Sequence, residues 1–208
     1  MSNARFADHP AVAHQRAVIA NLKRNTGKTL DEWVRLVKNS APKTRKERVQ
    51  WLKTEHRLGM TTANVIAGAV EGRKPEDYNP QKFLDGLYTG AKAALRPIND
   101  ELIRLGMALG PDVAATPCKT FVPLRRRHVF AQIKPTTNTR IDLGLALGKT
   151  KATGRLIDTG GLAKGDRITH RISITSVAEI DAEVKRWMKT AYEMDETEAQ
   201  VHPLRAKT

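Results

Sequence analysis

Basic side chains are the residues of this sequence whose type and spacing could do chemistry. Arg125, Arg126 and Arg127 are consecutive, and His128 follows them directly. Guanidinium groups bind phosphate oxygens through paired hydrogen bonds, so such a run predicts contact with phosphates or other anions. Over all 208 residues, 36 Lys and Arg stand against 22 Asp and Glu, which gives a net charge of +14.

The positive charge falls into two blocks. Residues 1–74 contain 15 basic and 6 acidic side chains, a net of +9, and residues 117–175 contain 12 and 3, again +9. Residues 75–116 (4 basic, 6 acidic) and 176–208 (5 basic, 7 acidic) each carry a net of −2. Two separate basic regions are typical of proteins that bind nucleic acid or another polyanion. A generally basic surface that only aids solubility is the alternative.

Three motifs that suggest enzymatic chemistry fail on their own requirements. The Gly-Lys-Thr triplets at 27–29 and 148–150 lack the glycine that a P-loop needs five residues before its Gly-Lys pair. Residues 158–160, Asp-Thr-Gly, resemble the catalytic turn of aspartic proteases, but the chain around them predicts an ordinary turn. Cys118 has no evident acid or carboxamide to support a catalytic histidine, so we expect no thiol enzyme.

The histidines and the single cysteine predict neither a metal site nor a cofactor. The six histidines show no close ligand spacing such as i and i+4, and Cys118 alone cannot build a thiolate zinc site. Cys118 also cannot form an internal disulfide. Since no 18-residue apolar run exists and residues 1–10 lack the apolar part of a secretory signal, we expect a protein of the bacterial or general cytoplasm.

The first element expected to position basic residues is a small helical bundle over residues 10–72. Thr29 and Thr44 each precede a glutamate by three residues, a spacing that predicts a capping box at a helix start. Residues 45–70 have the outline of a helix-turn-helix, but the second helix is apolar, so we expect phosphate contact without base recognition. The residues expected to make that contact are Lys43, Arg45, Lys46 and Arg48.

A polar segment with two prolines, residues 73–81, is predicted to be a linker to an α+β domain at 82–195, which a tail at 196–208 follows. This domain begins with a helical stretch that Pro97 divides, and it ends with an amphipathic helix opened by a Ser176–Glu179 capping box. Between them, period-two hydrophobicity predicts strands at 119–124, 129–134, 141–147 and 167–175. The order predicts a two-layer sandwich with a mainly antiparallel sheet of four to five strands.

Alternation along the strands assigns side chains to the two faces of this sheet. The isoleucines at 168, 172 and 174 set the inward parity, so His170 points to the core and Arg171 to the open face. Basic residues there would surround one exposed ring, Phe130, a platform suited to phosphates and a stacked base. The alternative is a solvated face with Phe130 covered. The candidate anion-binding residues of this domain are Lys119, Arg125, Arg126, Arg127, Phe130, Lys134, Arg140 and Arg171.

Several segments resemble two bacterial families of unknown function. The first, a small helical domain, is resembled at residues 21–33 and 49–59, and the second at 117–127, 130–136, 140–145 and 165–172. The resemblances cover roughly residues 12–195 and imply a tandem of two domains, with no catalytic residue. The second domain also resembles frataxin-like sandwiches distantly, in architecture only, and its basic surface argues against an acidic iron-binding ridge.

Three classes of function follow as hypotheses. The favoured one is non-enzymatic binding of nucleic acid or another polyanion through basic surfaces on both domains. The second is a small-anion or enzyme site at the rim of the sheet, and the third is a scaffold that engages a partner with both domains. The rim site would be formed by Cys118, Lys119, Arg125, Arg127, His128, Asp142, Asp158 and His170.

Overall fold

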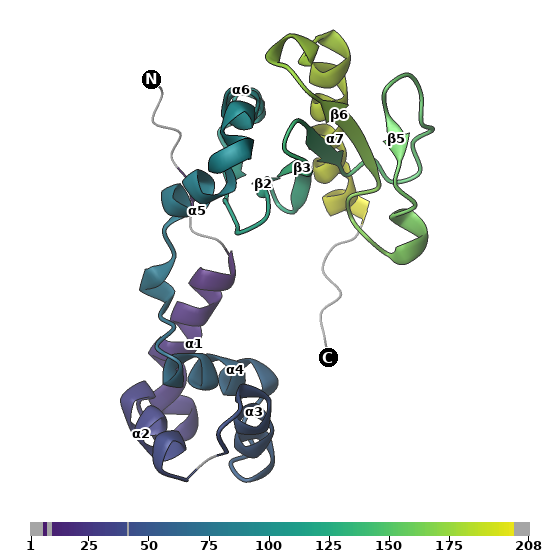
Figure 1. Ribbon diagram of the computed structural model, residues 1–208. Coiled ribbons are helices and arrows are strands. Elements are labelled where there is room, and N and C mark those ends of the chain that lie inside the picture. The colour runs from purple at the N-terminus through teal and green to yellow at the C-terminus, as the bar shows by residue number, and fades with distance from the viewer. Residues whose placement is uncertain (1–5, 8–9, 41, 202–208) are drawn as a thin grey trace. The chain divides into compact units, whose positions relative to one another are not determined.

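The chain, in a computed structural model that describes residues 6–7, 10–40 and 42–201, divides into two compact units. One unit spans residues 8–79, and the other combines residues 1–7 with 80–208 (Figure 1). Phe6 packs against the core of the second unit, and the Ala7 N–H donates to the Ala115 carbonyl at 3.2 Å. The helical unit is therefore an insertion into the sheet unit, with a chain connection to it at both ends.

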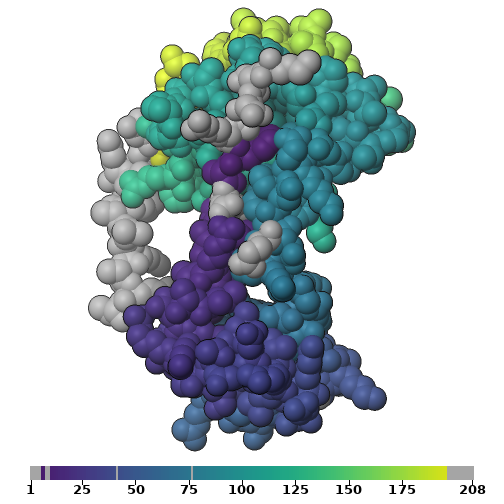
Figure 2. Space-filling view, turned by 90° about the vertical axis from the view of Figure 1, so that its left-hand side faces the viewer, coloured from purple at the N-terminus to yellow at the C-terminus, as the bar shows by residue number. Residues whose placement is uncertain are grey.

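The helical unit, coloured purple to blue in Figure 2, contains four α-helices around one apolar core in its described part. They are α1 (Pro10–Thr26), α2 (Leu30–Ser40), α3 (Arg45–Thr54) and α4 (Met60–Val70). Both predicted capping boxes are confirmed, because Thr29 and Thr44 accept the N–H of the glutamate three residues on, and each glutamate bonds back. The buried core residues are Leu22, Trp33, Val37, Leu52, Ala63 and Ile66.

The segment predicted as a linker contains a short 3-10 helix, η1 (Pro75–Asp77). The helical stretch that follows divides at Pro97, as predicted, and Pro97 lies in the first turn of its helix, where a missing N–H costs no bond. The elements are α5 (Pro80–Leu87), the 3-10 helix η2 (Gly90–Leu95) and α6 (Arg96–Met107). No helix in the described part of the chain is long and apolar enough to cross a membrane.

The sheet unit is α+β, as predicted, with an antiparallel sheet in the order β1-β2-β3-β4-β6-β5. The strands are β1 (Ala114–Ala115), β2 (Val122–Arg125), β3 (Val129–Pro135), β4 (Ile141–Leu145), β5 (Ile157–Asp158) and β6 (His170–Ile174). The sheet has six strands where four to five were predicted, because β1 and β5 are two residues long and too short to show alternation. The 3-10 helix η3 (Leu162–Lys164) lies between β5 and β6.

Helices α6 and α7 (Ala182–Val201) pack on the apolar face of this sheet and against each other. Register pairs such as Leu143 with Ile172 place alternate apolar side chains on that face. A Cβ added at Gly106 of α6 would lie 2.4 Å from the Leu124 side chain, so this glycine allows α6 to approach the sheet closely. Helix α7 continues beyond residue 195 into the predicted tail, and residues 202–208 lie outside the described chain.

The start of α7 differs from its prediction. A 3-10 helix, η4 (Val177–Glu179), precedes it, and the Glu179 carboxylate accepts the backbone N–H and the hydroxyl of Thr175 at 2.9 and 2.6 Å. Asp181 is the residue that caps α7, because its Oδ1 accepts the N–H groups of Glu183 and Val184. The predicted cap at Ser176 is wrong, since Glu179 closes the turn before the helix rather than the helix itself.

Candidate anion-binding surface

The open face, the side of the sheet opposite α6 and α7, carries three cationic side chains around Asp142. Lys134 lies opposite Asp142 in the β3–β4 pairing, and Arg171 reaches Asp142 Oδ1 at 3.3 Å. Arg140 Nε lies 3.1 Å from the same oxygen. Three cations and one carboxylate give this open-face cluster a net charge of +2. The arginine side chains keep 35% and 33% of their surface exposed, so they can still contact a ligand.

Phe130 does not belong to this surface, and the prediction of an exposed ring is wrong. The pairing shifts between β2 and β3, since Leu124 lies opposite Ala131 but Arg125 lies opposite Val129. The extra residue on β3 is Phe130, and such a bulge re-aims a side chain. The ring is fully buried and meets Tyr192 of α7 edge-on, with centroids 5.7 Å apart. Position 130 therefore offers no ring to stack a base.

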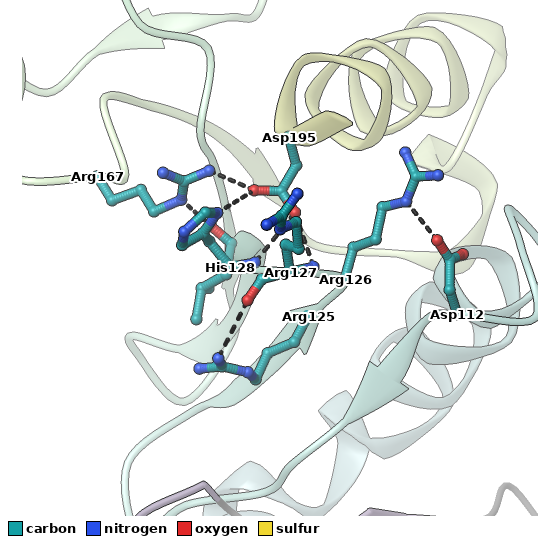
Figure 3. A network of polar contacts seen from close by, with 8 residues as sticks. Asp112, Arg125, Arg126, Arg127, His128, Arg167 and Asp195 are labelled. Carbon is teal, nitrogen blue, oxygen red and sulfur yellow. Dashed lines mark hydrogen bonds and ion pairs between the residues drawn. The ribbon is translucent and has the colours of Figure 1, made fainter. Parts of the chain in front are cut away.

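The arginine turn, which runs from Arg125 at the end of β2 to His128 just before β3, is fixed by Asp195 of α7 (Figure 3). Asp195 is 1% exposed, and its Oδ2 accepts the backbone N–H groups of Arg127 and His128, both at 3.0 Å. Its Oδ1 accepts from His128 Nδ1 at 3.0 Å and pairs with Arg167. Because one buried carboxylate binds four donors from two segments, it fixes both the backbone of the turn and the His128 ring.

The charge state of Asp195 follows from these contacts. Burial favours the neutral acid, but the N–H and ring of His128 and the charge of Arg167 outweigh it and lower the pKa of Asp195 from its ordinary value. An ionised carboxylate can only accept hydrogen bonds, so the facing nitrogen of His128, Nδ1, carries a proton. The Nε2 atom lies on the other side of a ring whose side chain is 51% exposed.

The three arginines of the turn have different surroundings. Arg126 pairs with Asp112, and its guanidinium lies 4.4 Å from the centre of the Tyr192 ring, so it belongs to the packing between the turn and α7. Arg127 is exposed, and Arg125 is half-buried with its Nη2 donating to the Arg127 carbonyl at 3.4 Å. The turn therefore presents Arg127 and His128 to solvent, with Arg125 beside them.

Of the predicted basic residues of the helical unit, two are paired within the fold and two are exposed. Arg45 pairs with Glu71 at 3.1 Å, and Arg48 Nε donates to the Pro42 carbonyl at 2.9 Å, so both arginines take part in local structure. Lys43 and Lys46 are exposed. In the sheet unit Lys119, just before β2, is exposed as well.

The eight residues of the alternative rim site are spread over both faces of the sheet. His170 is buried on the core face, as predicted, with Nδ1 2.8 Å from the Thr169 hydroxyl, whereas Asp142 lies on the open face. The inward assignment of Ile168 is wrong, because Ile168 precedes β6, is half-buried, and lies against the open-face side of Gly144. Asp158 accepts the Gly160 N–H at 2.7 Å, as in a turn, and burial raises the pKa of Cys118. No group of three metal-binding side chains occurs among the described residues.

Comparison with known families places both units. The family described as "Domain of unknown function (DUF5655)" matches residues 84–195, more than half of the chain. The chain belongs to the DUF5655 family. A second family, "Domain of unknown function (DUF4287)", matches residues 14–72, so the tandem of two domains of unknown function is confirmed. Neither a curated protein nor a solved structure matches the chain, and the frataxin-like architecture stays a prediction.

The DUF5655 domain contains the open-face cluster and the arginine turn, and Asp195 is the last residue of its match. Asp195 and its partner Arg167 are not among the site residues predicted from the sequence. An indication was available, because Asp195 continues the spacing of Val184, Met188 and Ala191 along the buried stripe of α7. A carboxylate at such a position needs donors from elsewhere in the fold.

Proposed function

We propose that this chain binds nucleic acid, or another polyanion, through phosphate contacts and without catalysing a reaction on it. The observation that carries the proposal is the open-face cluster, in which Arg140 and Arg171 pair with Asp142 and Lys134 lies opposite it on the next strand, on the side of the sheet away from α6 and α7. Paired arginines in a partly exposed position are suited to phosphate oxygens.

A polymer fits the spacing of the basic residues better than a small anion does. The arginine turn lies at one end of β3, at Val129, and Lys134 lies at the other end. Five residues of extended chain span about 17 Å at roughly 3.4 Å per residue. One phosphate group cannot contact both the arginine turn and the open-face cluster, so a ligand that contacts both must carry several phosphates.

We expect the protein to contact the phosphate backbone of the nucleic acid and not its bases. The exposed large hydrophobic side chains of the described residues are Met60, Ile157, Leu162 and Val177, and none of them is aromatic. Proteins that prefer single strands stack bases on aromatic rings, and Phe130 is buried. We therefore expect weak sequence preference and no strong preference for single strands.

The helical unit supplies a second basic region through Lys43 and Lys46. Two regions on one chain bind a long polyanion more tightly than either does alone, because the second contact becomes intramolecular. The sheet unit accordingly makes the main contact and the helical unit a supporting one.

Fluorescence anisotropy with a mixed-sequence duplex and its single strand tests this function. Phosphate contacts make log affinity fall with log salt by about 0.7–0.9 per neutralised phosphate. We expect K134A to reduce this slope by about one unit. The matched control is K189A, which removes an exposed lysine of α7 that lies 3.6 Å from Glu193. No micromolar binding at about 50 mM salt would overturn the proposal.

A further inference from the structure

His128 stands apart from the other cations of the arginine turn because its charge depends on one proton. Asp195 fixes the ring through Nδ1, and no described residue donates to or accepts from Nε2. In the neutral ring Nε2 is therefore a hydrogen-bond acceptor. A phosphate oxygen also accepts, so neutral His128 has nothing to offer a phosphate at this position.

Protonation reverses the character of Nε2. The ring becomes a cation with an N–H donor on its exposed side, next to the exposed Arg127 and half-buried Arg125. The orientation needs no adjustment, because the Asp195 carboxylate accepts from Nδ1 in both states. Imidazole is the side chain that most commonly serves as a proton-dependent switch in proteins.

We propose that His128 is a proton-gated phosphate-binding residue, and that the arginine turn binds a phosphodiester oxygen most tightly when both ring nitrogens carry protons. This inference rests on the proposed function and adds its regulation by pH. Binding takes up a proton at Nε2, and the new N–H donates to the phosphate. Affinity therefore falls as pH rises.

The charged groups around His128 oppose one another. From α7, Asp195 favours the charged ring, and from the turn itself Arg125 and Arg127 disfavour it. Arg167, from the segment before β6, and Arg126, beside Asp112, are each paired with a carboxylate. A phosphate bound between Arg127 and His128 adds the negative charge that stabilises the protonated ring, so ligand and proton bind cooperatively.

The test measures the affinity for a DNA duplex with hydroxyl groups at all ends, from about pH 5.5 to about pH 8.5, at constant low salt. Internal phosphodiesters do not titrate in this range, whereas a terminal phosphate would. We expect the wild-type affinity to fall about three- to tenfold between about pH 6 and about pH 8. H128Q keeps a polar side chain that does not titrate, and its affinity should not change with pH.

H14Q is the matched control, because His14 is an exposed histidine of the helical unit, on α1. It should show the wild-type pH profile, and melting curves should confirm that both variants fold. Calorimetry in two buffers of different ionisation enthalpy should show proton uptake by wild type and none by H128Q. A wild-type slope retained in H128Q, or a flat wild-type profile, would overturn this inference and leave the proposed function standing. Failure to bind at every pH would overturn both.

Discussion

At the arginine turn, one carboxylate determines how the neighbouring polar groups lie. Asp195 receives two backbone N–H groups and a ring N–H, and it pairs with Arg167, while its own surface is almost fully buried. Removal of such a group leaves its donors unsatisfied at a partly buried site, which costs more than the interaction itself contributed. The exposed basic groups of the turn thus depend on a residue that no ligand could touch.

We expect Asp195→Ala to lower the free energy of unfolding by about 2–4 kcal/mol, measured by denaturant titration. Asp112→Ala, which removes the half-exposed partner of Arg126, should cost no more than about 1 kcal/mol. Because the pKa of Asp195 is lowered in the folded state, its contribution is present above the ordinary aspartate value of about 3.9 and is lost as pH falls through the folded value. Equal losses in the two variants, or a loss that persists unchanged in acid, would contradict this account.

Two adjacent residues of β6 should give opposite phenotypes. His170→Ala removes a buried ring from the core face and should lower the melting temperature with little change in polyanion affinity. Arg171→Ala removes a partly exposed cation and should reduce the salt slope by about one unit with little change in melting temperature. Thermal melts and salt-titrated anisotropy of both variants make the comparison, and reversed phenotypes would mean that the faces of β6 are assigned wrongly.

At the scale of elements, regular periodicity was predictable and local departures from it were not. Alternation placed Leu143 and Ile172 on the core face correctly, because every second residue of a regular strand shares a face. The same rule failed at Phe130, where one extra residue breaks the alternation and the Tyr192 ring offers a buried partner. The partner belongs to a helix far along the chain, so no local pattern could reveal it.

The candidate site shows the same division. The cluster of Lys134, Arg140 and Arg171 follows from strand parity alone, since all three lie on or beside regular strands. The contact of Asp195 with His128 joins residues 67 positions apart, and only the tertiary fold brings them together. The position of the N-terminal cap of α7 also depends on the tertiary fold, because Arg155 pairs with Asp181 and Glu183 at the start of this helix.

The cap of α7 gives a prediction at this scale. Asp181→Ala should lower the free energy of unfolding by about 1 kcal/mol or somewhat more, because two N–H groups lose their acceptor and Arg155 loses one of its partners. Ser176→Ala is the control, and it should change stability by less than about 0.5 kcal/mol, since Ser176 makes no side-chain cap. Chemical denaturation of both variants decides between the two cap positions, and a larger effect at Ser176 would restore the one that the sequence suggested.

At the scale of the whole molecule, each unit has its own hydrophobic core. Leu52 belongs to the core of the helical unit and Leu143 to that of the sheet unit, and both are fully buried. Separate cores allow the two units to lose structure in separate steps.

We therefore expect two unfolding transitions. Leu52→Ala should lower the midpoint of one transition, and Leu143→Ala should lower the midpoint of the other. Each substitution should reduce the free energy of unfolding of its unit by about 2–4 kcal/mol. Trp33 and Trp51 belong to the helical unit and Trp187 to the sheet unit. In a Trp187→Phe background the fluorescence should therefore follow the transition that Leu52→Ala shifts, whereas far-UV circular dichroism reports both. One cooperative transition that both variants shift equally would show that the units unfold together.

The insertion of the helical unit bears on the order in which the chain folds during synthesis. All core residues of that unit precede residue 80, so it can fold before any strand of the sheet has left the ribosome. Phe6 and Ala7 leave earlier still, yet their partners, including Ala115, emerge only after the helical unit is complete. Since α1 contacts η1, the folded helical unit shortens the loop that this late contact must close. When the helical unit is complete, at residue 79, Ala115 has not yet been synthesised. Phe6 and Ala7 can therefore make their native contacts only later, after the helical unit has folded.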